Sequence, residues 1–104
     1  MGVRKSKEEN FQINGSLSEV IEKCYRALQN GGFKKIRFNE TINQFEADYK
    51  QVVGTIWGEI KITLTVNSGL VNVNVVAWAN VDNIYALFSS PIDKILLKFK
   101  SNLY

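Results

Sequence analysis

The feature that most constrains this chain is an alternation of apolar and polar residues between Thr55 and Ala79. A strict period of two over this length predicts two β-strands that share one buried face. The apolar positions are Ile60, Ile62, Leu64 and Val66, then Val71, Val73, Val75 and Ala77. Between them, Ser68-Gly69 suits a two-residue turn because glycine tolerates a positive φ. The stretch is therefore predicted to form a β-hairpin.

A turn at Ser68-Gly69 also fixes the register of this hairpin. Asn67 is then opposite Leu70, and Leu64 is opposite Val73. A slip of one residue would expose half of the apolar side chains to water, so this register is strongly preferred. The opposite face then carries polar and aromatic side chains, which are our candidates for a ligand-binding or partner-binding site. They are Trp57, Lys61, Thr63, Thr65, Asn72, Asn74, Val76 and Trp78.

The composition argues against several classes of function. The 104 residues, 45 % hydrophobic and 22 % charged, are typical of one globular domain. Histidine is absent and Cys24 is the single cysteine, so a disulfide, a metal site or a histidine-based catalytic site is not expected. Cys24 itself is interpreted as a buried apolar residue. We therefore expect no cofactor, no metal and no enzyme activity.

Elements on both sides of the hairpin complete the predicted fold. Residues 1–9 are polar and charged and are predicted to be a disordered tail. The other elements are a short strand at Phe11–Ile13, a helix from the capping box of Ser16 and Glu19 to Asn30-Gly31-Gly32, strands at Phe33–Phe38 and Phe45–Tyr49, and a helix that opens at Ser90-Pro91. Residues 10–104 are thus predicted to form a single α+β domain of order β-α-β-β-β-β-α. Its expected architecture is a two-layer sandwich, with both helices on the apolar face of an antiparallel sheet.

Three shorter segments bear on partners and localisation. Asn80–Phe88 is rich in apolar residues, and it is predicted to be a helical turn, a packed loop or a lid over a pocket. Met1-Gly2 followed by Ser6 matches the N-myristoylation pattern, a weak signal. No apolar run reaches the length of a membrane span, and with a single cysteine the chain is expected to be cytoplasmic.

Two short motifs in the chain resemble those of known proteins. Gly32-Phe33-Lys34-Lys35-Ile36 and Trp57-Gly58-Glu59-Ile60-Lys61-Ile62 are similar to strands of small uncharacterised prokaryotic proteins that carry a W-G-E strand motif. The predicted element order, with a long C-terminal helix on an antiparallel sheet, resembles the TATA-binding-protein-like group of folds, which includes the Bet v 1-like helix-grip proteins. The resemblance implies a fold and no activity.

Three hypotheses about function remain open from the sequence. The first is an interaction module whose outer sheet face binds a second copy, as a homodimer, or another macromolecule. The second is a carrier of a small apolar ligand, in a pocket between the C-terminal helix and the sheet. The third is a weak nucleic-acid binder that uses the same face together with the basic N-terminal tail, since the net charge is +3.

Overall fold

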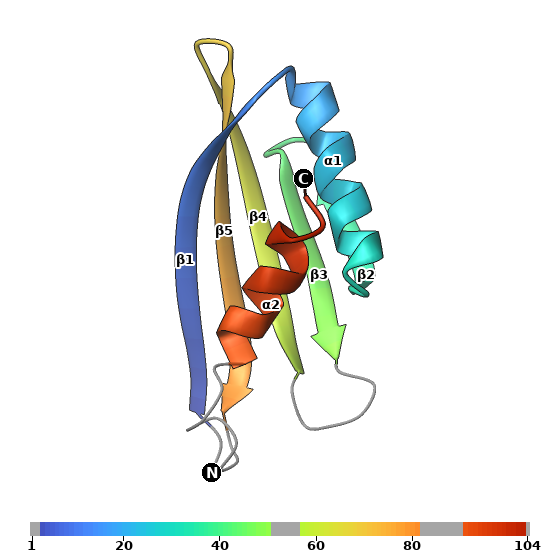
Figure 1. Cartoon of the computed structure of the whole chain (residues 1–104), viewed down its shortest axis with the longest axis vertical. Helices are drawn as coiled ribbons and strands as arrows, with labels where there is room; N and C mark the ends of the chain where they lie inside the picture. The colour runs from blue at the N-terminus through green and yellow to red at the C-terminus, as the bar shows by residue number, and fades with distance from the viewer. Residues whose placement is uncertain (1–2, 51–56, 82–90, 104) are drawn as a thin grey trace.

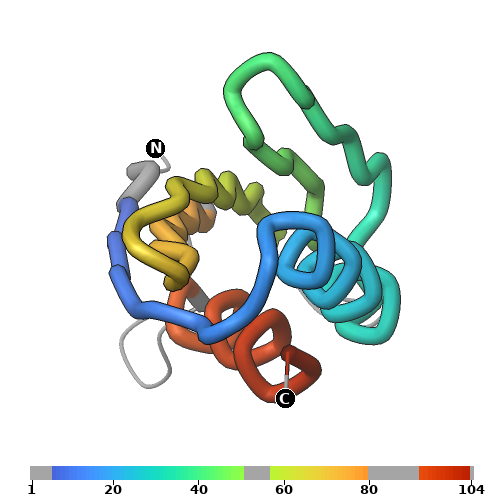
Figure 2. Tube along the Cα trace, turned by 90° about the horizontal axis from the view of Figure 1, so that it is seen from above, coloured from blue at the N-terminus to red at the C-terminus, as the bar shows by residue number. Residues whose placement is uncertain are grey.

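The described part of the chain forms one antiparallel sheet of five strands, and two helices pack on one face of this sheet (Figures 1 and 2). The computed structural model describes residues 3–50, 57–81 and 91–103. In chain order, the elements are β1 (Val3–Asn14), α1 (Leu17–Asn30), β2 (Lys34–Asn39), β3 (Gln44–Lys50), β4 (Trp57–Asn67), β5 (Leu70–Val81) and α2 (Pro91–Lys100). The strands lie side by side in the order β1-β5-β4-β3-β2. This is the predicted two-layer α+β fold.

The β4–β5 hairpin has the register predicted from the sequence. Asn67 pairs with Leu70 and Leu64 pairs with Val73. Both turn residues have a positive φ, 50° at Ser68 and 82° at Gly69. This is the combination that matches the twist of the flanking strands. Val66 is the exception among the apolar positions, because it is 57 % exposed at the tip, beyond the end of β3.

Helix α1 begins and ends where its local sequence predicts. Ser16 and Glu19 form the capping box, with the Glu19 amide donating to Ser16 Oγ over 3.2 Å. At the other end, the amides of Gly32 and Phe33 donate to the carbonyl oxygens of Gln29 and Leu28, and Gly32 has a φ of 82°. This pair of bonds is a Schellman motif, in which glycine supplies the left-handed residue.

Helix α2 provides much of the core. Its apolar face, with Ile95 and Phe99 fully buried, packs on β5 and β4, and its C-terminal part meets α1. The core also takes alternate residues of the strands, including Phe45, Ile62 and Val75. The buried residues of α1 and α2 recur every three or four positions, so each helix has one face in the core, as the predicted two-layer sandwich requires.

The N-terminal prediction was wrong for residues 3–9. These residues belong to β1, which pairs with β5 without interruption from Val3 opposite Val81 to Asn14 opposite Leu70. Residues 3–9 show no apolar alternation, so only the neighbouring strand specifies the extension. The structure does not describe residues 1–2, 51–56, 82–90 and 104. The predictions for the Met1-Gly2 motif and for the Ser90 cap therefore lie outside the described residues. The predicted Asn80–Phe88 segment is described only at Asn80 and Val81, where β5 ends.

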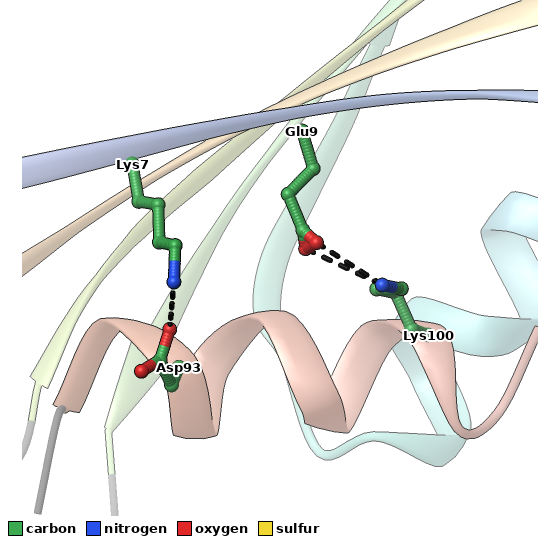
Figure 3. A network of polar contacts seen from close by, with 4 residues as sticks. All are labelled: Lys7, Glu9, Asp93 and Lys100. Atoms are coloured by element: carbon green, nitrogen blue, oxygen red, sulfur yellow. Dashed lines mark hydrogen bonds and ion pairs between the residues drawn. The ribbon is translucent and has the colours of Figure 1, made fainter.

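Two ion pairs connect the charged half of β1 to α2 (Figure 3). Lys7 Nζ lies 2.7 Å from Asp93 Oδ1, and Lys100 Nζ lies 3.0 Å from Glu9 Oε2. Lys7 and Glu9 are on the helix side of the sheet because they are opposite the buried Ala77 and Val75. Charges that point inward on an edge strand also discourage pairing with another chain. Both pairs are at least partly exposed, so salt should weaken them.

The Lys7–Asp93 pair should make a pH-dependent contribution to stability. The hydrogen bond to Asp93 and the negative charge of Asp93 raise the pKa of Lys7 above its ordinary value. A lysine whose pKa is higher in the folded state than in the unfolded state stabilises the fold fully at pH values below its pKa in the unfolded state. This contribution to the free energy of unfolding is lost as the pH rises through the pKa of the folded state. We expect Lys7→Met to lower the urea midpoint at about pH 8, and the difference from the parent chain to shrink at about pH 12. Lys23→Met, on the exposed side of α1, is the control, and an equal effect of both substitutions would contradict the prediction.

Candidate functional site

The face of the sheet that points away from the helices, called here the outer face, carries all eight predicted site residues. On β4 they alternate with the buried Ile60, Ile62 and Leu64, and on β5 with buried valines and alanines. The ladder aligns them in pairs across the two strands: Lys61 with Val76, Thr63 with Asn74, and Thr65 with Asn72. Their location follows from the register, and their role in binding stays a prediction.

The two tryptophans lie at the end of the outer face that is remote from the hairpin turn. Trp57 is 48 % exposed and borders a hollow of about 380 Å³ that Asp48, Lys50 and Glu59 also line. Trp78 is half-buried, opposite Glu59, and Lys61 Nζ is 5.6 Å from its ring centroid. That distance is within the range of a cation–π contact. Trp57 is therefore the more accessible of the two rings.

Neighbouring strands add charges of both signs to this end of the face. Glu8 of β1 is opposite Val76, and Glu46 and Asp48 of β3 are opposite Lys61 and Glu59. Arg37 Nη2, on β2, lies 3.5 Å from Asp48 Oδ1. The alternation of Glu46 and Asp48 with apolar neighbours is visible in the sequence, but which strands flank the hairpin is not.

The end nearer the hairpin turn is uncharged. Asn10 and Gln12 of β1 lie opposite Asn74 and Asn72 of β5, and Gln44 of β3 lies opposite Thr63. Gln44 Nε2 donates a 2.9 Å hydrogen bond to Thr63 Oγ1. An open groove of about 670 Å³ runs over this end. Its lining, which we call the amide groove, is Asn10, Phe11, Gln12, Thr65, Asn72 and Asn74.

Cys24 lies in the core and not on the outer face. It is fully buried on α1, and burial raises the pKa of its thiol to about 12. A thiol with this pKa is protonated at neutral pH and is a poor nucleophile. Within the described ranges, no three histidine, cysteine or acidic side chains are grouped so that they would hold a metal ion. Neither described helix is long and apolar enough to cross a membrane.

Comparisons with known proteins show the fold and no family. No family model matches the chain, and no curated protein matches its sequence. Among solved structures, truncated norcoclaurine synthase from Thalictrum flavum is similar with a TM-score of 0.63 at 9 % identity, over 98 % of this chain and 92 % of that one. Ara h 8.0201 is similar with a TM-score of 0.66 at 8 % identity, over 97 % and 96 % of the two chains.

A bacterial structure shows a more distant likeness. A TBP-like protein from Parabacteroides distasonis has a TM-score of 0.51 at 10 % identity, over 96 % of this chain and 92 % of that one. The chain has a Bet v 1-like and TBP-like fold. This confirms the fold that the element order implied. At these identities the likeness shows the fold alone, and the resemblance to prokaryotic proteins with a W-G-E strand stays a prediction.

Proposed function

We propose that this chain is a cytoplasmic, non-enzymatic interaction module that self-associates through the tryptophan end of its outer face. The observation that carries the proposal is the position of Trp57 and Trp78 on one sheet face, with nearly half of the Trp57 surface exposed. Tryptophan is among the residues that contribute most to protein interfaces when a partner covers it. Val76, also half-buried, extends the apolar part of this surface.

The charges around the tryptophans favour a protein partner over a nucleic acid. Glu8, Glu46 and Asp48 join Glu59 on this face, so a phosphate backbone would meet carboxylates as well as lysines. A second copy of the chain presents both signs of charge, and it also presents the same aromatic side chains. The nucleic-acid hypothesis has less support, because binding of that kind depends on a predominantly basic surface.

The alternative of an apolar-ligand carrier has weaker support from the described residues. Side chains fill the contact between α2 and the sheet, where Ile95, Phe99 and Val75 are fully buried. A groove of about 210 Å³ lies beside α2, lined by Tyr49, Leu97 and the two lysines Lys94 and Lys98 together with Ser101. That volume is below the roughly 300 Å³ at which small-molecule sites usually begin.

Self-association is tested by measuring molar mass against concentration. Light scattering from about 5 μM to about 1 mM should show a rise from the monomer towards the dimer. Trp57→Ala should weaken the association by about tenfold or more, because it truncates a side chain at the centre of the contact. Leu97→Ala is the control, since it removes an exposed apolar side chain from α2, on the helix layer. A monomer mass across the whole range, or an equal effect of both substitutions, would overturn the proposal.

A further inference from the structure

The amide groove is chemically distinct from the rest of the outer face. None of the six residues that line it is ionisable, whereas the next outward residue of β5, Val76, lies between Glu8 of β1 and Lys61 of β4. Asn74 is four positions along β5 from Trp78, which is roughly 13 Å at the rise of a strand. The groove is thus a separate, neutral region towards the hairpin turn, and its volume is within the usual range for small-molecule sites.

Hydrogen-bonding capacity in the groove is largely unused. Asn74 Oδ1 is buried and accepts no hydrogen bond from any described residue. A buried acceptor without a donor costs free energy, which a ligand or water molecule would recover if a rotation of the Asn74 side chain brought the oxygen to the groove. The carboxamides of Asn10, Gln12 and Asn72 make no side-chain hydrogen bond with another described residue. Each carboxamide offers two donors and one acceptor oxygen side by side.

These features select one class of ligand. A charged ligand would lose hydration in the groove without gaining an opposite charge, which is unfavourable. A neutral ligand that both donates and accepts at adjacent atoms fits the carboxamides, and a pair of neighbouring hydroxyl groups on a sugar ring has that property. An extended peptide would instead use its backbone groups, which pair at a sheet edge and not on a sheet face. We propose that the amide groove binds the vicinal hydroxyls of a neutral oligosaccharide.

The proposal is tested by an NMR titration of the intact chain with cellotetraose, maltotetraose, xylotetraose and chitotetraose. At least one of them should cause saturable shifts in the side-chain amides of Asn72, Asn74 and Gln12. Tetragalacturonate, which is charged, should bind at least about tenfold more weakly. No saturable shift with any of the four neutral probes, equal binding of the charged probe, or shifts confined to α2 would each overturn the proposal.

Variants separate recognition from folding. Asn74→Ala removes the unpaired acceptor Oδ1 and should weaken binding by about tenfold or more. Asn72→Ala removes a neighbouring carboxamide, should have a similar effect on binding, and serves as the second variant if Asn74→Ala folds poorly. Gln29→Ala deletes a carboxamide from the exposed side of α1 and should leave binding unchanged. Unchanged binding in folded Asn74→Ala and Asn72→Ala would also overturn the proposal. Because the groove does not include Trp57 or Trp78, these results are independent of the self-association test.

Discussion

Replacing Leu96 with alanine is expected to destabilise the fold by about 2–5 kcal/mol, whereas the same change at Leu97 should cost less than about 0.5 kcal/mol. Leu96 is 3 % exposed and belongs to the core, and Leu97, the next residue, is 65 % exposed. The first substitution removes buried methyl groups and leaves a cavity. The second removes side-chain atoms that are already mostly in water.

Urea unfolding followed by tryptophan fluorescence measures both variants. A protein of this size has a total stability of about 5–15 kcal/mol, so Leu96→Ala should lower the midpoint clearly without changing the slope. The pair is a matched control for helix propensity, because both variants put alanine into the same helix. Similar losses at the two positions would contradict the orientation of α2 in the structure.

Replacing Gly58 with alanine is expected to destabilise the chain by about 3 kcal/mol or more. A Cβ at this position would clash with the backbone oxygen of Trp78, and it would lie 3.0 Å from Ala79 Cα and 3.0 Å from Ile95 Cδ1. Two of these atoms belong to the backbone of β5, so relief requires the strands to separate. The expected result is a melting temperature lower by more than about 10 °C.

Gly32→Ala is the control for this substitution. Gly32 has a φ of 82° and no atom within 4 Å of the added Cβ, so only backbone strain of about 1–2 kcal/mol opposes the change. Circular dichroism at increasing temperature compares the two variants. A larger drop in melting temperature for Gly32→Ala than for Gly58→Ala would contradict the prediction that close packing between β4, β5 and α2 requires glycine at position 58.

The outer face combines two different surfaces on one sheet. The charges and tryptophans lie at one end, and the neutral amides lie at the other. The β4–β5 ladder contributes to both, because every second residue of each strand points to the outer face. The two proposals above therefore concern opposite ends of one face.

The elements whose local sequence carries a strong signal were predictable. The β4–β5 hairpin follows from its period of two and from a turn that accepts two positive φ values. The N-terminus of α1 follows from Ser16 and Glu19, whose side chains and amides cap each other locally. These interactions join residues close in sequence, so they need no knowledge of the rest of the fold. The placement of the eight candidate residues on one face follows in the same way.

By contrast, residues 3–9 have no apolar pattern that predicts a strand. They become β1 because β5 offers an unpaired edge along its whole length, and because α2 places Asp93 and Lys100 within reach of Lys7 and Glu9. The same holds for the amide groove, which needs Asn10 and Gln12 beside Asn72 and Asn74. Short-range sterics and periodicity specify the hairpin, the ends of α1 and the buried faces of β4 and β5, so these follow from local sequence. Which strands are neighbours depends on contacts between residues far apart in the chain, and it becomes known with the packed structure.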